Sequence, residues 1–170
     1  MRPLVLDATP LIYLTRVGLG LVFEGLGCEL VTSPRVKAEV VEEGARRGYP
    51  DALVLGELFR RGVIEVRKPF DGSLVERLLE ARGLHAADAD VLALALELKG
   101  VAVVDDEAAR KTARIFGASY VGTPFVLMRA VARGLVTRGR AVDAFREMIQ
   151  AGWRCDVGTY DAVMGALRRL

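Results

Sequence analysis

Short apolar runs that alternate with helical patterns constrain the fold of this chain most strongly. Each run is followed by a segment whose apolar residues recur at helical spacing. Short strands that are apolar throughout are typical of a parallel sheet covered by helices on both faces. The pattern therefore predicts a three-layer α/β/α fold with a parallel sheet of four or five strands. The predicted strands are 4–6, 29–31, 63–66, 101–104 and 119–121.

Helix signals fill the segments between these strands. Ser33 and Pro34 form a strong helix start, with Ser33 as the N-cap and Pro34 at the first helical position. Gly44 is predicted to end that helix, because glycine is common just after a helix. The predicted helices are 10–17, 34–43, 51–61, 73–82, 88–99, 107–116, 125–133, 140–151 and 157–170.

The chain is expected to form a single domain, 1–170, with an α/β core at 1–122 and a helical extension at 123–170. No apolar run reaches the ~20 residues that a membrane span needs. Asp7 and Pro10 interrupt the apolar N-terminus, where a signal peptide has an unbroken apolar stretch. Because the two cysteines form neither a disulfide framework nor a metal motif, we expect a cytoplasmic protein.

The formal net charge of +2 is too mild to indicate a nucleic-acid partner by itself. Asparagine is absent, and Gln150 is the single glutamine. This depletion of thermolabile amides indicates either a thermophile or a GC-rich genome.

Acidic residues follow two of the predicted strands. Asp7 comes directly after the first strand, and Asp105 and Asp106 follow the fourth. Ligands of open α/β sheets bind beyond the carboxyl ends of the strands, so these acids are candidates for one site. Each could instead start a turn or cap the next helix. That reading is hard to sustain for both Asp105 and Asp106, because adjacent carboxylates repel unless a cation lies between them.

Two further acids lie on or beside the buried faces of predicted helices. Glu39 comes three residues after Val36 and borders the apolar stripe of its helix, although it could be a solvated helix position. Asp88 shares a helix face with Leu92, and such a buried carboxylate is costly without a partner. It could also be favoured by the positive end of the helix. Asp90 points away from Asp88 and could be the solvated one of this pair.

Asp7, Glu39, Asp88 and Asp106 together are typical of a Mg²⁺ or Mn²⁺ site, since these ions prefer carboxylates and water. Such ions activate water and stabilise the charge of a phosphoryl displacement. Because His85 is the single histidine, a His-pair ribonuclease and an HExxH zinc site are excluded, and His85 is either structural or a peripheral substrate contact. No phosphate-binding loop motif is present.

The sequence resembles the PIN-domain family in four motifs that occur in order. LVLDATPLIYL carries Asp7 and Thr9, and TSPRVKAEVVEEG carries Glu39. HAADADVLALALELKG supplies the third acid, with both Asp88 and Asp90 available, and VAVVDDEAARKTA carries Asp106. Thr9 replaces the more common serine and keeps a hydroxyl. The C-terminal part is similar to the helical end of a prokaryotic PIN subgroup of predicted nucleic-acid-binding proteins.

The resemblance implies a metal-dependent endoribonuclease that cleaves single-stranded RNA, with a toxin–antitoxin pair as one context. Asp7 and Asp106 would be the principal metal ligands, Glu39 and Asp88 would hold ligand waters or a second ion, and Asp105 is an additional candidate. Thr9 would orient Asp7 or a water. One alternative is a PIN module that binds nucleic acid without turnover. Another is a phosphohydrolase with an aspartyl nucleophile, but Thr9 occupies the place of its second aspartate.

The resemblance also suggests partners. An antitoxin protein and a homodimer are expected, with Phe59, Leu79 and Met128 either at the dimer interface or in the core. Phosphate binding requires cations, because the acids alone would repel RNA. Arg110, Lys111 and Arg114 follow Asp106 on the next helix and are candidates, although they could equally form a solvated helix face.

Overall fold

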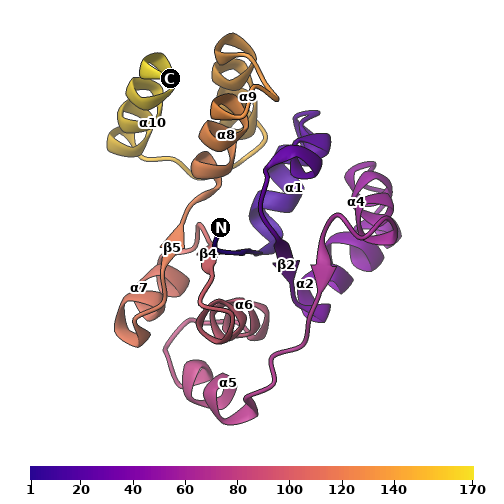
Figure 1. The fold of residues 1–170 in the computed structure, drawn as a ribbon, viewed down its shortest axis with the longest axis vertical. Coiled ribbons are helices and arrows are strands. Elements are labelled where there is room, and N and C mark those ends of the chain that lie inside the picture. Colours follow the sequence, from indigo (N-terminus) through magenta and orange to yellow (C-terminus); the bar gives the residue numbers. More distant parts are fainter.

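A single parallel sheet forms the centre of the computed structural model, which describes residues 1–170. The strands are β1 (Leu4–Leu6), β2 (Leu30–Thr32), β3 (Glu65–Val66), β4 (Val101–Val103) and β5 (Tyr120–Val121). Their order in the sheet is β3-β2-β1-β4-β5, and every neighbouring pair is parallel. Helices lie on both sides of the strands (Figure 1), so the predicted three-layer α/β/α fold is confirmed.

The helices form two layers around this sheet. They are α1 (Ala8–Arg16), the 3₁₀-helix η1 (Gly20–Gly25), α2 (Pro34–Lys37), the π-helix η2 (Ala38–Glu43), α3 (Gly44–Arg46), α4 (Asp51–Arg60), α5 (Gly72–Leu79), α6 (Ala86–Glu97), α7 (Glu107–Phe116), α8 (Thr123–Ala132), α9 (Arg138–Gln150) and α10 (Val157–Arg169). In Figure 1, α1, α8, α9 and α10 lie above the strands, and α5, α6 and α7 lie below them. None of the helices has both the length and the apolar character of a membrane span.

The middle strand, β1, is buried on both faces. Its Val5 and Leu6 are fully buried, as expected for a parallel strand between two helix layers. Leu6 pairs with Val103 of β4, and the Thr32 hydroxyl of β2 donates a 2.6 Å hydrogen bond to the Leu6 carbonyl. The carboxyl ends of these three strands are therefore fixed relative to one another.

The C-terminal helices share the hydrophobic core of the sheet. One contiguous cluster of buried residues includes Leu6 of β1 as well as Phe145 of α9 and Met164 of α10. Phe145 is fully buried and contacts the Trp153 ring edge-on, with the ring centroids 5.7 Å apart. Aromatic pairs in this geometry contribute beyond the area that they bury. The helical extension is thus packed onto the α/β part and continuous with it.

The predicted helix start at Ser33 is present, but the predicted end at Gly44 is wrong. Ser33 Oγ accepts a 3.2 Å hydrogen bond from the Val36 N–H, as an N-cap does. The helix then continues through η2 and α3, past Gly44. A Cβ atom at Gly44 would lie 3.1 Å from the Ala52 Cβ of α4. Glycine therefore allows α4 to pack closely at this position, and the chain turns at Gly48 with a φ of +74°.

We predict that Gly100→Ala destabilises the protein, because a Cβ at Gly100 would lie only 2.9 Å from the Pro3 carbonyl oxygen beside β1. Separating β1 from β4 to relieve this clash should cost about 1–3 kcal/mol. Gly139→Ala is the control, since Gly139 lies in α9 with open space around it and alanine favours helix. Urea denaturation measures both; equal midpoints for the two variants would contradict the prediction.

Candidate active site

The carboxyl ends of β1 and β4 bring acidic residues to the same edge of the sheet. The backbone N–H of Asp7 donates to the Val103 carbonyl at 3.2 Å, which extends the pairing of the two strands by one residue. Asp105 and Asp106 follow β4 after Val104. The sequence prediction placed these acids at neighbouring strand ends, and this is where the structure has them.

Asp7 is buried, with only 7% of its surface exposed. Its pKa is raised to about 7, chiefly by burial and then by the carboxylate of Asp88. Glu39 and Asp105 also raise this pKa, whereas the backbone N–H of Ala8 lowers it. Asp7 forms no salt bridge, so the like charges around it are not offset by a paired cation. A bound proton or a bound cation would relieve the repulsion.

Asp88 and Glu39 come to Asp7 from two different helices. Asp88 lies in the first turn of α6, and its carboxylate accepts a 3.1 Å hydrogen bond from the His85 N–H. Burial raises the pKa of Asp88, the His85 hydrogen bond lowers it, and Asp106 raises it. Glu39 lies on the π-helix η2, and its pKa is raised by desolvation and then by Glu43 and Asp88. Single π-helical turns occur often at functional sites.

Asp90 is not solvated, which corrects the reading that it was the exposed member of the pair. It is 3% exposed, and one carboxylate oxygen lies 2.6 Å from Nη1 of Arg35. Asp90 is thus neutralised by an arginine, whereas Asp88 has no cationic partner and lies near Asp7, Glu39 and Asp106. Nothing in the sequence pattern indicated Arg35 as the partner of Asp90.

Asp105 is held by donors from three parts of the chain. Its carboxylate accepts hydrogen bonds from the backbone N–H of Thr123 at 2.9 Å and from the Thr123 hydroxyl. It also accepts from Arg110 and from the indole N–H of Trp153, both at 3.1 Å. Asp105 therefore ties the end of β4 to α8 and to the loop before α10. The sequence holds one signal for the contact between Trp153 and Asp105: a buried indole N–H needs a hydrogen-bond acceptor.

Asp106 is exposed and caps α7. Its Oδ1 accepts a 3.1 Å hydrogen bond from the Ala109 N–H, so the capping role considered from the sequence is present. This bond occupies one carboxylate oxygen, and the other makes no hydrogen bond. Asp106 also lies close enough to Asp88 to raise its pKa. Asp106 can therefore cap α7 and still belong to the group of acids at the sheet edge.

Thr9 lies half-buried in the first turn of α1, and its hydroxyl makes no hydrogen bond to Asp7. No direct contact therefore supports the proposed role of Thr9 in orienting Asp7. His85 is exposed at the start of α6, and its positive form lowers the pKa of both Glu39 and Asp88. It lies beside the acids and is not part of the core.

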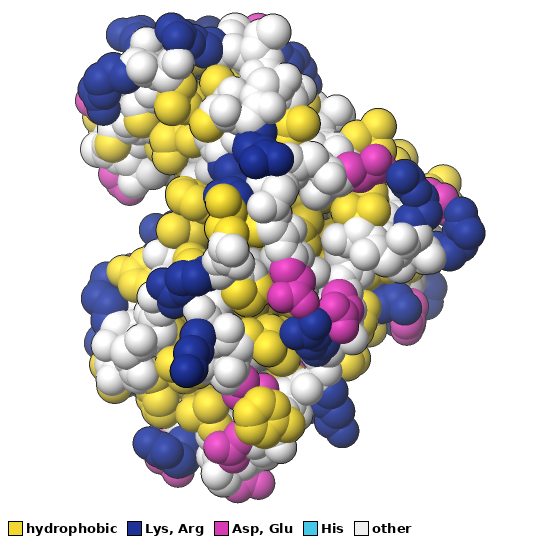
Figure 2. All heavy atoms as spheres, viewed as in Figure 1, with side chains coloured by type: hydrophobic (Ala, Val, Ile, Leu, Met, Phe, Trp, Pro, Cys, Tyr) yellow, Lys and Arg dark blue, Asp and Glu magenta, His cyan; other side chains and the backbone are white.

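The three cations predicted to bind phosphate are differently placed. Arg110 is directed inward, with hydrogen bonds to the Val104 carbonyl and to Asp105. Arg114 lies over the Tyr120 ring and donates to its hydroxyl at 2.9 Å, while Lys111 is exposed. On the face shown in Figure 2, Lys and Arg side chains are dispersed among acidic and apolar ones and form no single basic patch.

Family membership follows from a comparison of the whole chain. A sequence model for the PIN domain matches residues 3–169. The chain belongs to the PIN-domain family. PIN domains are generally nucleases and typically use divalent metal ions. A search of curated proteins found no match.

The donor set of this PIN domain fits a hard divalent cation. The acids at the sheet edge offer only carboxylate oxygens, which Mg²⁺ and Mn²⁺ prefer, and no cysteine lies among them. As the side chains are arranged, no three acidic, histidine or cysteine residues are close enough together to hold a metal ion. Asp7 and Asp88 are nevertheless near enough for each ionised carboxylate to disfavour the other, and a cation offsets such repulsion.

We predict that Asp7→Asn changes how stability depends on pH. The folded-state pKa of about 7 lies above the unfolded value of about 4. In a chelating buffer the unfolding free energy of the wild type should therefore fall as the pH rises from about 4 to about 7. Asp7→Asn removes the titrating group and should reduce the part of this fall that lies between pH 5 and pH 8 by up to about 3 kcal/mol. Urea denaturation at pH 5 and pH 8 measures the change.

The control for this prediction is Asp71→Asn at the N-cap of α5. Hydrogen bonds from Ser73 and Leu74 lower the pKa of Asp71, so its contribution is lost only at pH values below that window. Asp71→Asn should keep the wild-type fall between pH 5 and pH 8. The same fall in Asp7→Asn as in wild type would show that Asp7 does not titrate in this range.

Proposed function

We propose that this PIN domain is an endoribonuclease that cleaves single-stranded RNA with water activated by Mg²⁺ or Mn²⁺. One observation carries the proposal: β1, η2, α6 and the turn before α7 each direct a carboxylate to the same edge of the sheet. The carboxyl ends of parallel strands are where α/β enzymes bind their substrates. The activity of the family supports the choice of phosphodiester hydrolysis.

In this proposal the four acids have two different roles. Asp7 and Asp106 would hold the cation, and Asp88 and Glu39 would position water or a second ion. The cation would lower the pKa of a water molecule and stabilise the charge that develops on the phosphate. Glu39 reaches solvent and has a raised pKa, which suits its carboxylate to accept the proton of the attacking water.

A role as the toxin of a toxin–antitoxin pair, with an antitoxin protein as partner, is part of the proposal and is supported by the resemblance to such nucleases. A small reading frame next to the gene would favour it. A PIN module that binds nucleic acid without turnover is the second candidate. The spacing of the acids favours this candidate, because no three of them lie close enough together to hold a metal ion.

We predict that the protein cleaves single-stranded RNA in Mg²⁺ or Mn²⁺ and is inactive in EDTA. Asp106→Asn should lower the cleavage rate on the order of 100-fold or more, since a ligand and a charge are lost. Asp156→Asn is a matched control because Asp156 caps α10 as Asp106 caps α7. Asparagine caps nearly as well as aspartate, so both variants should melt close to wild type.

A second matched pair separates the two central acids. Asp88→Asn should lose activity, whereas Asp90→Asn should keep cleavage but melt at a lower temperature, because Arg35 loses its buried partner. Gel-based cleavage assays and thermal melts measure these outcomes. Cleavage at the wild-type rate in EDTA, or by Asp106→Asn, would rule out the metal mechanism; no cleavage under any condition would favour the binding module.

We also predict a homodimer, with a light-scattering mass of twice the 18.5 kDa chain. Of the three apolar residues proposed for the interface, Phe59 and Met128 are half-buried against the core. Leu79 is 42% exposed at the end of α5, so Leu79→Asp should yield monomers. Ile115→Asp, at an exposed apolar position of α7, is the control that should stay dimeric. A monomeric wild type at working concentration would end this part of the proposal.

A further inference from the structure

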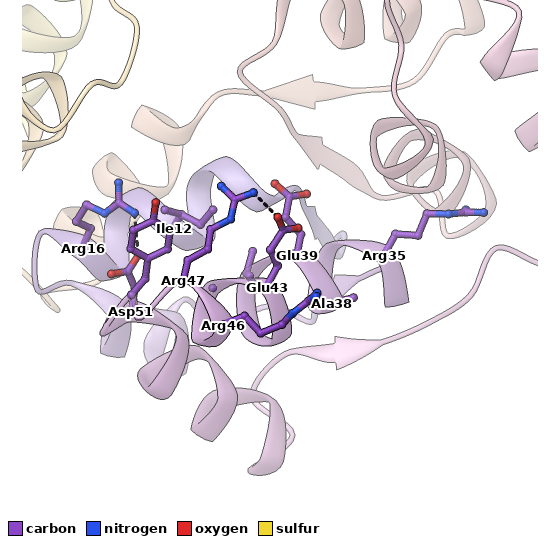
Figure 3. Close-up of a pocket in the computed structure, with 12 residues that line it drawn as sticks. Ile12, Arg16, Arg35, Ala38, Glu39, Glu43, Arg46, Arg47 and Asp51 are labelled. Atoms are coloured by element: carbon purple, nitrogen blue, oxygen red, sulfur yellow. Dashed lines mark hydrogen bonds and ion pairs between the residues drawn. The ribbon is translucent and has the colours of Figure 1, made fainter.

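A groove lined by arginines adjoins the acids. Its volume is about 500 Å³, and it lies between α1, η2 and the start of α4. Figure 3 shows Glu39 and Glu43 beside Arg47 in the middle of the groove, with Arg16 toward one end and Arg35 toward the other. Glu39, one of the four proposed metal-site acids, is among the residues that line this groove. The groove therefore shares one residue with the candidate active site.

Two of the arginines are available to a phosphate. Arg46 is exposed and forms no salt bridge, unlike the other arginines of the groove. Arg47 pairs with Glu43 one helical turn away, and both side chains are well exposed. Exposed pairs of this kind contribute little stability, so a phosphate can replace Glu43 at small cost. The planar guanidinium group also suits bidentate phosphate binding better than lysine does.

A stack of Tyr13, Arg16 and Tyr49 lies at the end of the groove opposite Arg35, and Arg16 and Tyr49 line the groove itself. The Arg16 guanidinium lies 5.6 Å from the Tyr13 ring centroid and 5.4 Å from that of Tyr49. Asp51, which is buried, holds Arg16 through a 3.1 Å salt bridge. Tyr49 is 45% exposed at the outer end of this stack. An exposed ring that is fixed in place from behind offers a platform on which a nucleobase can stack.

We propose that this groove binds the single-stranded RNA on one side of the scissile phosphate, with one nucleobase stacked on Tyr49 and a phosphate bound by Arg46 and Arg47. The inference rests on the proposed function and adds the residues that hold the substrate. A groove that combines a stacking ring with exposed cations matches a nucleotide chain, which presents bases and phosphates alternately. Stacking tolerates any base, so the site binds without strong sequence preference.

Fluorescence anisotropy with a labelled 12-nucleotide single-stranded RNA in EDTA tests binding apart from cleavage. Tyr49→Ala should weaken binding about tenfold, while Tyr49→Phe, which keeps the ring, should bind as wild type does. The double variant Arg46→Ala/Arg47→Ala should weaken binding and reduce the slope of log K against log salt by about 0.7, since the one phosphate that these residues bind contributes about 0.7 for a single strand.

Arg146→Ala is the matched control for the arginines. Arg146 is an exposed arginine with a nearby acid, Asp143, and it does not line the groove. Arg146→Ala should change the salt slope by less than the double variant does. Thermal melts identify any variant that is unfolded. Wild-type affinity for Tyr49→Ala, an unchanged salt slope for the double variant, or no RNA binding by the wild type would each overturn the inference.

Failure of this inference and failure of the proposed function give different results. If the groove variants lose binding but no condition yields cleavage, the groove stands and the nuclease proposal falls. If Tyr49→Ala and the double arginine variant cleave RNA with the kcat and KM of wild type, the nuclease proposal stands and the groove is not the substrate site. A rise in KM with an unchanged kcat supports both.

Discussion

The parallel pairing of β1 with β4 is the constraint on which the rest of the molecule depends. The register that joins Leu6 to Val103 makes both strands end at the same level, so Asp7 and the Asp105-Asp106 pair emerge side by side. The pairing buries both strands, and helices must then cover both faces of the sheet. The same register therefore sets the three layers and the concentration of negative charge at one edge.

The fold was predictable because its signals are local. Ser33 and Pro34 specify a helix start within four residues of chain, and the structure has that cap. The helix end predicted at Gly44 was wrong because the need for glycine there is not local. Gly44 allows the close approach of α4, which the sequence around Gly44 does not encode. The strand ends moved by one or two residues, since pairing across the sheet decides them.

The candidate site was predictable in its residue types and less so in its contacts. Acids after strands mark the sheet edge from sequence alone, because parallel strands share their carboxyl ends. The partner of each acid depends on long-range packing. Asp90 was the candidate for a solvated acid and instead pairs with Arg35, and Arg110, one of three candidate phosphate ligands, forms a salt bridge with Asp105. The Tyr49 platform is also invisible in sequence, since its neighbour in space is Arg16 on another helix.

The pattern of pairing among the acids that are little exposed indicates which of them are reserved for a ligand. Asp51, Asp90 and Asp105 each form a salt bridge with an arginine, and this offsets the cost of removing a carboxylate from water. Asp7 and Asp88 are equally buried and have no arginine. The carboxylate of Asp88 raises the pKa of Asp7, because it disfavours a second negative charge beside it. A fold that pairs its other buried carboxylates with arginine leaves these two to be neutralised by something that binds between them. A proton does so at low pH, and a divalent cation would do so at neutral pH.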